Sequence, residues 1–168
     1  MKPSHHLILG SVAGVATIPI LGPYSGAFVA ASFLIDSDHY LSYVWRNRLR
    51  DFSLRRAISF NRRLVSVVKV TPFLGLDVFH TIEALLVVYI LAIILSHQFL
   101  HAIAWGMIFH IALDIAYLLK RGIIFKRAHS LLEYLVRRRH MINRGQKPWE
   151  PFHSILSEMG IGKPNTKD

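Results

Sequence analysis

Residues 78–119 read VFHTIEALLVVYILAIILSHQFLHAIAWGMIFHIALDIAYLL. This stretch holds two apolar runs, Val78–Leu95 and Phe99–Leu119, which only the short connection Ser96–Gln98 separates. An α-helix needs about 20 apolar residues to cross the hydrocarbon core of a bilayer. We therefore predict that the two runs are transmembrane helices joined as a hairpin.

A second apolar hairpin lies nearer the N-terminus. Its runs are Leu7–Leu21 and Tyr24–Ile35, with the turn dipeptide Gly22-Pro23 between them. Each run is shorter than a full span, so the pair crosses a thinned bilayer or is shielded by neighbouring helices. A cleaved signal peptide after Lys2 is the alternative. We favour the uncleaved helix because glycines interrupt the first run and a second apolar run follows at once.

Composition and charge placement agree with a membrane class. Hydrophobic residues make up 52% of the chain and the mean hydropathy is positive. All 20 Lys and Arg lie outside the apolar runs, eight of them within Arg46–Lys69 and nine within Lys120–Lys147. The positive-inside rule places such blocks in the cytoplasm. We therefore expect a membrane protein with cytoplasmic termini, membrane lipids as partners and no nucleic acid.

The basic blocks also carry apolar residues at helical spacing. Residues 49–65 and 123–141 mix Leu, Ile, Val and Phe with arginine, which predicts amphipathic helices lying on anionic headgroups. For the first block a solvated loop is the alternative. The predicted fold class is an all-α integral membrane protein with about four transmembrane or membrane-embedded helices plus basic amphipathic interfacial helices. It forms a single membrane domain of a hairpin (1–40), a basic cytoplasmic segment (41–72), a second hairpin (73–120) and a basic amphipathic helix with a tail (121–168).

Ionisable residues within the apolar runs are the candidate functional residues. Each costs about 3 kcal/mol to insert at the centre of a span, so such residues tend to mark ion, proton or catalytic sites. The predicted topology brings these residues toward the membrane face that carries the basic blocks. The candidate metal ligands are His6, Asp36, Asp38, His39, His80, His110 and Asp114. The chain has no cysteine, so a metal must use nitrogen and oxygen ligands, which suit zinc first, or manganese or iron, as one ion or two.

Spacing separates the candidates further. His110 and Asp114 are four residues apart and share one helix face, where a structural explanation is hardest to give. Asp77, His80 and Glu83 follow one another at intervals of three. We favour Asp77 as the N-terminal cap or first-turn acid of its helix. Glu83 is expected one turn deeper, where a capping role fails, and is the candidate general base.

Other polar residues admit simpler interpretations. His6 is as well explained by a hydrogen bond to a neighbouring helix as by metal binding. Residues 36–39 could cap a helix end at the headgroups, although a cap needs only one of them. His97 and His101 are also four apart, but they fall at the opposite face and are left out of the site.

The order of these motifs is similar to a known family. His6 precedes an apolar helix, residues 35–39 read IDSDH, residues 79–81 read FHT, and residues 110–114 read HIALD. This pattern resembles the bacterial and archaeal membrane-bound metal-dependent hydrolases of the YdjM-like type, over about the first 120 residues. The chain departs from the family at Ile35, where a proline is usual, and at Glu83, where many members carry an apolar residue. The resemblance implies a metal site and a location in the prokaryotic inner membrane, and it leaves the substrate open.

The expected function is a metal-dependent hydrolase at the cytoplasmic lipid boundary, acting on a phosphoester of a lipid or a related anionic substrate. A transporter or channel for a metal ion or proton is the first alternative. It requires polar residues along the whole path, whereas the third run is apolar from Ala84 to Leu95 apart from Tyr89. A non-catalytic membrane protein with a structural metal or polar cluster is the second alternative.

Overall fold

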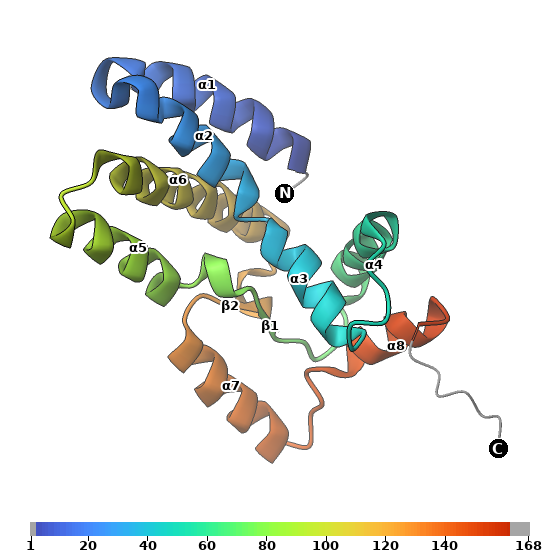
Figure 1. The fold of residues 1–168 in the computed structure, drawn as a ribbon. Coiled ribbons are helices and arrows are strands. Elements are labelled where there is room, and N and C mark those ends of the chain that lie inside the picture. The colour runs from blue at the N-terminus through green and yellow to red at the C-terminus, as the bar shows by residue number, and fades with distance from the viewer. Residues whose placement is uncertain (1–2, 162–168) are drawn as a thin grey trace. The chain divides into compact units, whose positions relative to one another are not determined.

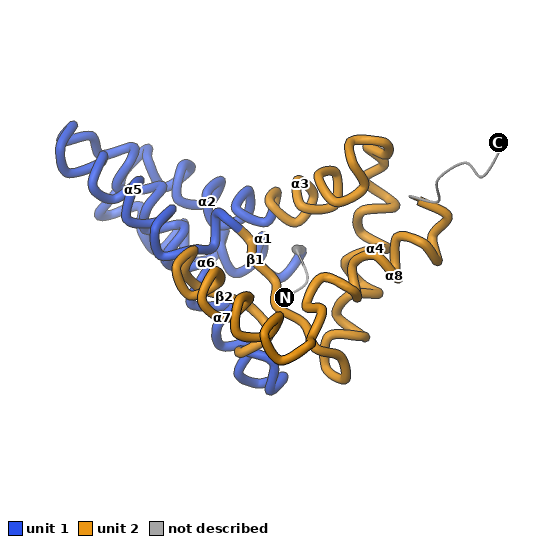
Figure 2. The backbone as a smooth tube through the Cα atoms, turned by 90° about the horizontal axis from the view of Figure 1, so that it is seen from below, with its two compact units in different colours: residues 1–36, 78–124 blue, residues 37–77, 125–168 orange. Residues whose placement is uncertain are grey.

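The computed structural model describes residues 3–161, and these residues are mostly helical, which confirms the predicted all-α class. They form two compact units, coloured separately in Figure 2. Unit 1 comprises Met1–Asp36 and Val78–Ile124, and unit 2 comprises Ser37–Asp77 and Phe125–Asp168, in each case as far as the residues are described. Each unit is therefore built from two segments that are distant in the sequence.

The described residues of unit 1 form four α-helices. Helix α2 packs against both α1 and α6, and α5 packs against the other side of α6 (Figure 1). The elements are α1 (Pro3–Leu21), the 3-10 turn η1 (Gly22–Tyr24), α2 (Ser25–Leu34), the 3-10 turn η2 (Val78–His80), α5 (Ile82–Ile94) and α6 (Gln98–Arg121). The two predicted hairpins are both present as α1–α2 and α5–α6.

Glycines set the close packing of the first hairpin. The chain turns at Gly22, whose φ of +53° lies in the left-handed region that glycine adopts without strain. A Cβ on Gly10 would lie 2.2 Å from Ser32 Oγ, and a Cβ on Gly14 would lie 2.2 Å from Val29 Cγ2. Because Gly10 lies beside Ser32 and Gly14 lies beside Val29, α1 and α2 run antiparallel. The small residues allow the two helices to approach more closely than larger side chains would.

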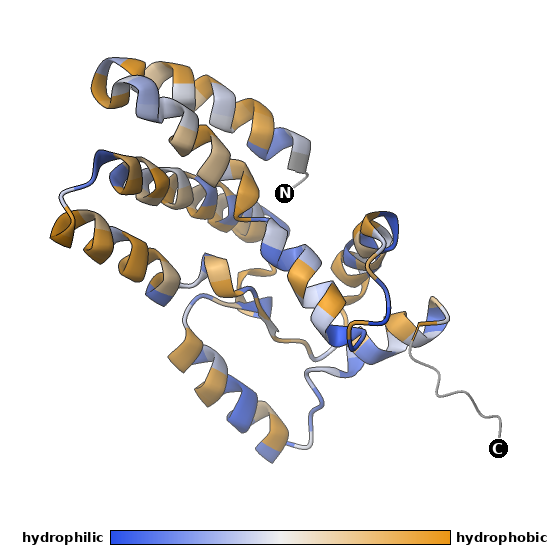
Figure 3. Cartoon of the chain, viewed as in Figure 1, coloured by the Kyte–Doolittle hydropathy of each residue, from blue (hydrophilic) through white to orange (hydrophobic). Residues whose placement is uncertain are grey.

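The surface of unit 1 is apolar and several buried groups are polar. Along α5 the only buried residue is Ala92, and the helix is almost wholly hydrophobic in Figure 3. Large exposed apolar side chains on α1 and α5 include Ile8, Val12, Val15, Val87, Ile90, Ile93 and Ile94. His6, His110 and Asp114 are buried instead. This distribution is typical of a protein whose surroundings are less polar than water.

Among the described residues, two helical stretches are long and apolar enough to cross a membrane. They are residues 4–46, which include α1 and turn back at Gly22, and α6. Helix α5 is apolar but has only 13 residues. The structure thus supports membrane association through two candidate spans, where the sequence predicted four.

Unit 2 carries the basic segments around a small aromatic core. Its elements are α3 (Ser37–Arg46), α4 (Leu54–Val67), β1 (Gly75–Leu76), β2 (Arg127–Ala128), α7 (Leu131–Asn143) and α8 (Glu150–Glu158), with the 3-10 turn η3 (Ile124–Lys126) leading into β2. Strands β1 and β2 pair in parallel. Phe152 contacts Phe60 and Phe73, and the guanidinium of Arg46 lies 3.3 Å from the centre of the Phe152 ring.

Several elements differ from the sequence prediction. The second run does not end with Asp38 and His39, because α3 begins at Ser37 and takes both residues into its first turn. The first basic block does form the predicted helix, as α4, and not the loop given as the alternative. The paired strands β1 and β2 were not predicted, since two-residue strands carry no periodic signal. Helix α8 was also missed, because the sequence predicted only a tail after the basic amphipathic helix. Residues 162–168 of that tail lie outside the described residues.

Candidate metal centre

His110 and Asp114 form the base of a polar cluster inside unit 1. Both project from the same face of α6, as residues four apart in a helix do. Their exposed fractions are 0% and 5%, and His110 Nε2 lies 3.8 Å from Asp114 Oδ2. Burial of an imidazole beside a carboxylate in this way is costly unless each group finds partners.

The backbone of α2 fixes the protonation of His110. Its Nδ1 lies 2.7 Å from the carbonyl oxygen of Ser32. A carbonyl oxygen only accepts hydrogen bonds, so Nδ1 carries the proton and donates it. In the neutral ring this leaves Nε2 with a free lone pair, as in most metal-bound histidines, where the other ring nitrogen donates to a carbonyl or carboxylate.

The close approach of α2 and α6 makes that hydrogen bond possible. A Cβ on Gly106 would lie 2.4 Å from the carbonyl oxygen of Phe28 and 2.9 Å from Ala31 Cβ. Gly106 is one helical turn from His110, and Phe28 is one turn from Ser32. The glycine therefore lets the two backbones meet at the level where His110 reaches Ser32.

His80 brings a second Nε2 atom to the cluster. It ends the 3-10 turn η2 and is 2% exposed. Its Nε2 lies 3.0 Å from His110 Nε2. Since the His110 atom holds a lone pair, the two nitrogens either share one proton or direct two lone pairs at one cation.

Asp36 and His6 complete the cluster. Asp36 Oδ1 lies 3.5 Å from His110 Nε2 and 3.7 Å from His80 Nε2. The His6 ring stacks on the His110 ring with 3.9 Å between centroids, and its Nε2 lies 3.1 Å from Asp114 Oδ1. Both ring nitrogens of His6 are buried, and neither makes a well-aligned hydrogen bond within the described part of the chain. The contact with Asp114 therefore involves Nε2, and Nδ1 has no hydrogen-bond partner among the described residues.

The spacing of these atoms fits a metal ion. Ligands bound at about 2.0–2.2 Å from one ion lie about 2.8–3.6 Å from one another in tetrahedral or octahedral geometry. Three contacts within the cluster, at 3.0, 3.1 and 3.5 Å, lie within that range, and three at 3.7–3.8 Å lie just beyond it. Three imidazoles and two carboxylates form a donor set that suits zinc, manganese or iron. His6, Asp36, His110 and Asp114 each offer an atom within 4.8 Å of the others.

The remaining predicted ligands gather in unit 2. Asp38, His39 and Asp77 also offer atoms within 4.8 Å of one another, and His39 Nδ1 lies 3.2 Å from Asp77 Oδ1. Here the Arg127 guanidinium lies 3.0 Å from Asp77 Oδ2. A cation already in place raises the electrostatic cost of adding a divalent ion. This second group is therefore the weaker metal site.

The predicted capping role of Asp77 and the predicted depth of Glu83 in its helix are wrong. Thr81 caps α5, because its Oγ1 accepts a hydrogen bond from the Ala84 N–H, so Asp77 is not the cap and instead pairs with His39 and Arg127. Glu83 does not lie one turn inside the helix, since the 3-10 turn η2 delays the start of α5 and places Glu83 in its first turn. A carboxylate there is stabilised by the helix N-terminus.

The sequence reasoning missed two contributors. The Ser32 carbonyl is a backbone group that every residue type has, so the sequence does not mark it. Arg127 was counted within a basic block, although it is buried and lies beside Asp77. A fully buried Arg is rare unless paired, but its burial becomes visible only once β1 and β2 pair.

The comparisons with known proteins identify no relative. No protein-family model matches the chain. Neither a curated protein nor a solved structure matches it. The assignment of function therefore depends on the geometry of the cluster.

Proposed function

We propose that unit 1 binds one divalent metal ion, zinc in the first instance, and that the chain is a membrane-bound metal-dependent hydrolase. The ligands would be drawn from His6, Asp36, His80, His110 and Asp114. The observation that carries the proposal is the group of three buried imidazoles, whose Nε2 atoms lie among two carboxylates at 3.0–3.8 Å. Manganese or iron would suit the same donors.

The chain's own residues divide the work of hydrolysis. Asp36 is the most exposed of the five, with 15% of its side chain accessible, so water and substrate would reach the cluster beside it. Glu83 is the carboxylate of unit 1 that the ligand set leaves unused, and we assign it as the proton acceptor. A bound divalent ion lowers the pKa of its water and polarises a phosphoryl oxygen.

The surroundings support a lipid-like substrate at the cytoplasmic membrane face. The exposed apolar side chains of α1 and α5 suit contact with hydrocarbon, and the basic helices α4 and α7 suit anionic headgroups. We propose that the chain lies in a prokaryotic inner membrane with cytoplasmic termini and that its substrate is a phosphoester of a lipid or a related anionic molecule. The positive-inside rule supports that orientation.

The first test is metal content together with turnover. Protein purified in neutral detergent is analysed for transition metals and assayed with phospholipid and other phosphoester substrates. The expected result is about one ion per chain and hydrolysis, both lost in His110→Ala and Asp114→Asn. His101→Ala, on the same helix α6 but outside the cluster, is the matched control and should keep both. No bound metal in folded protein, even after zinc or manganese is added, would refute the proposal.

A non-catalytic polar cluster is the second candidate. The contact between His6 and Asp114 and the hydrogen bond from His110 to Ser32 connect α1, α2 and α6, so the same residues form an ion-pair network without a metal. This candidate predicts that His110→Ala lowers thermal stability and that no substrate is turned over. Metal bound without turnover would indicate a structural metal in the same place.

A further inference from the structure

Helix α7 is an amphipathic helix that buries none of its residues. It exposes Leu132, Leu135 and Val136, and Phe125 before it is 80% exposed. The basic residues Arg137–Arg139 and His140 follow directly in the sequence. Figure 3 shows the alternation of apolar and polar colour along α7. Exposed apolar residues next to a basic run are the composition of helices that lie at an anionic lipid surface.

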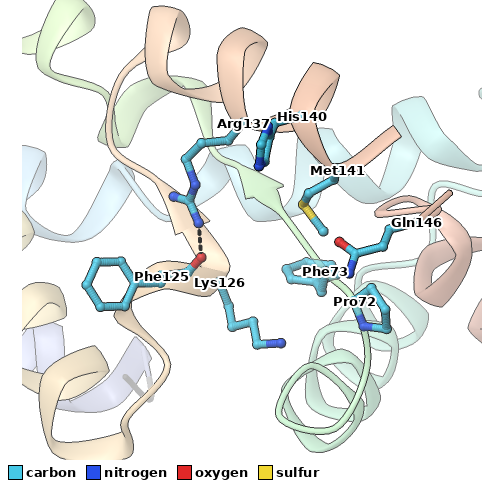
Figure 4. A pocket seen from close by; sticks show the side chains of 8 residues that line it. All are labelled: Pro72, Phe73, Phe125, Lys126, Arg137, His140, Met141 and Gln146. Atoms are coloured by element: carbon cyan, nitrogen blue, oxygen red, sulfur yellow. Dashed lines mark hydrogen bonds between the residues drawn. The ribbon is translucent and has the colours of Figure 1, made fainter. Parts of the chain in front are cut away.

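A cavity opens beside this helix, within unit 2 (Figure 4). Its volume is about 340 Å³, at the lower end of the range of about 300–1,000 Å³ typical of small-molecule sites. Four of its lining residues are cationic or polar, namely Lys126, Arg137, His140 and Gln146. The other four are apolar, namely Pro72, Phe73, Phe125 and Met141. Such a lining suits a ligand with an anionic head and an apolar body.

The cationic side chains of the cavity are held in place by the backbone. Lys126 Nζ donates to the Thr71 carbonyl at 2.8 Å. The Arg137 guanidinium donates to the carbonyl oxygen of Phe125 and to Glu133 Oε1. Groups that are ordered before a ligand arrives lose less conformational entropy when it binds.

Charge in the cavity is only partly compensated. Glu133 pairs with Arg137, and its pKa is low: burial alone would raise it, but the His129 N–H and the Arg137 guanidinium together hold it below the usual value. Neither Lys126 nor His140 has a carboxylate within ion-pair distance among residues 3–161. Lys126 therefore contributes positive charge that nothing in the described chain neutralises.

We propose that this cavity binds the phosphate group of an anionic phospholipid. Lys126 would contact the phosphate, and Arg137 and His140, whose side chains lie away from the Lys126 ammonium in Figure 4, would add positive or polar surroundings. Phe73 and Met141 would contact the glycerol and the first part of the acyl chain. The apolar side chains favour a lipid over free phosphate, which would leave them without a partner. The proposal involves unit 2 alone and stands without the metal site.

The test compares lipids and matched charge removals. Full-length protein in neutral detergent micelles is titrated with dioleoyl phosphatidic acid or dioleoyl phosphatidylcholine, and bound lipid is counted by native mass spectrometry. Lys126→Gln should weaken phosphatidic acid binding about tenfold, as expected for the loss of one charge-assisted hydrogen bond. Arg139→Gln is the control: it also removes one positive charge, but from a position on α7 that does not line the cavity. It should change phosphatidic acid binding less than about twofold. Lys126→Arg keeps the positive charge and should bind phosphatidic acid like the unaltered chain.

Three results would overturn the proposal. Equal loss in Lys126→Gln and Arg139→Gln would show attraction by the surface charge of α7 alone. Equal binding of phosphatidylcholine would show that the phosphate is not recognised through its net charge. Displacement of the lipid by inorganic phosphate at a similar concentration would identify free phosphate as the ligand. Circular dichroism of each variant establishes that it is folded.

Discussion

His80 and His110 approach each other through the same ring atom, with 3.0 Å between their Nε2 nitrogens. The Nδ1 of His110 is already committed to the Ser32 carbonyl. The pair must therefore share a proton or a metal ion between the two Nε2 atoms. A shared metal ion would make the stability of the protein depend on the metal, whereas a shared proton would not.

Removing the metal should destabilise the protein. A ligand at 1,000 times its dissociation constant adds about 4 kcal/mol to the stability of the folded state. A chelator is thus expected to lower the melting temperature of metal-loaded protein, with a much smaller effect on His80→Gln. His153→Gln, an exposed change in α8, is the control and should respond like the unaltered chain. Thermal unfolding that ignores the chelator would favour a shared proton.

Gly106→Ala should disturb both packing and metal binding. The added Cβ would meet the Phe28 carbonyl at 2.4 Å, and backbone cannot move aside as a side chain can. We expect a loss of about 1–3 kcal/mol in stability and a lower metal content, because α2 carries the carbonyl that orients His110. Gly26→Ala in α2 meets no atom within 4 Å and should be neutral or stabilising by up to about 1 kcal/mol. Equal melting temperatures for the two variants would contradict the close packing.

Unit 2 should lose stability in acid through Asp51. The Tyr43 hydroxyl at 2.6 Å, the Ser53 N–H and Arg56 hold the pKa of Asp51 below its usual 3.8. A carboxyl whose pKa is lowered on folding contributes stability above its unfolded value, and that stability is lost as the pH falls through the folded value. Melting temperatures measured from pH 6 downward should therefore fall below about pH 4. Asp51→Asn should make the melting temperature less dependent on pH in this range. Glu158→Gln, which removes an exposed carboxyl, should leave the pH dependence unchanged.

Two ion pairs of unit 2 should differ in strength because of their burial. Arg127 and Asp77 are nearly buried at 3.0 Å, whereas Arg63 and Glu158 are 49% and 64% exposed at 3.7 Å. Arg127→Gln should cost about 3 kcal/mol, because it removes the guanidinium from the largely buried Asp77 carboxylate. Arg63→Gln should cost less than about 1 kcal/mol. Chemical denaturation of the two variants in the same detergent measures the difference, and similar costs would argue against the buried pair.

The apolar surface of unit 1 predicts integral membrane behaviour. Membranes that contain the chain are washed with alkaline carbonate, which releases peripheral proteins, and the protein should stay in the pellet. Val87→Asp, on the exposed face of α5, should reduce that retention, since a charge within a span costs about 3 kcal/mol. Asn61→Asp, on the basic helix α4, is the control and should not change it. Release of the unaltered chain would mean that the exposed apolar residues are covered by another protein.

The helices were largely predictable. Apolar periodicity and the breaks at Gly22-Pro23 and Ser96–Gln98 mark the two hairpins, because a helix buries or exposes its faces according to local sequence. Helix starts were not predictable to the residue. Both Thr81 and Asp77 are residue types that cap helices, and the structure shows Thr81 as the N-terminal cap of α5. The 3-10 turn η2 before it depends on packing that the local sequence does not encode.

The sequence by itself determined the helical class, the apolar faces and a donor set without sulfur. It also placed His110 and Asp114 on one helix face, since four residues make about one turn. Only the tertiary structure decided which candidates share a unit, the tautomer of His110 and the pairing of Asp77 with Arg127. The reason is physical: the Ser32 carbonyl is 78 residues from His110, and a contact between distant backbone and side-chain atoms exists only once the helices that carry them have packed.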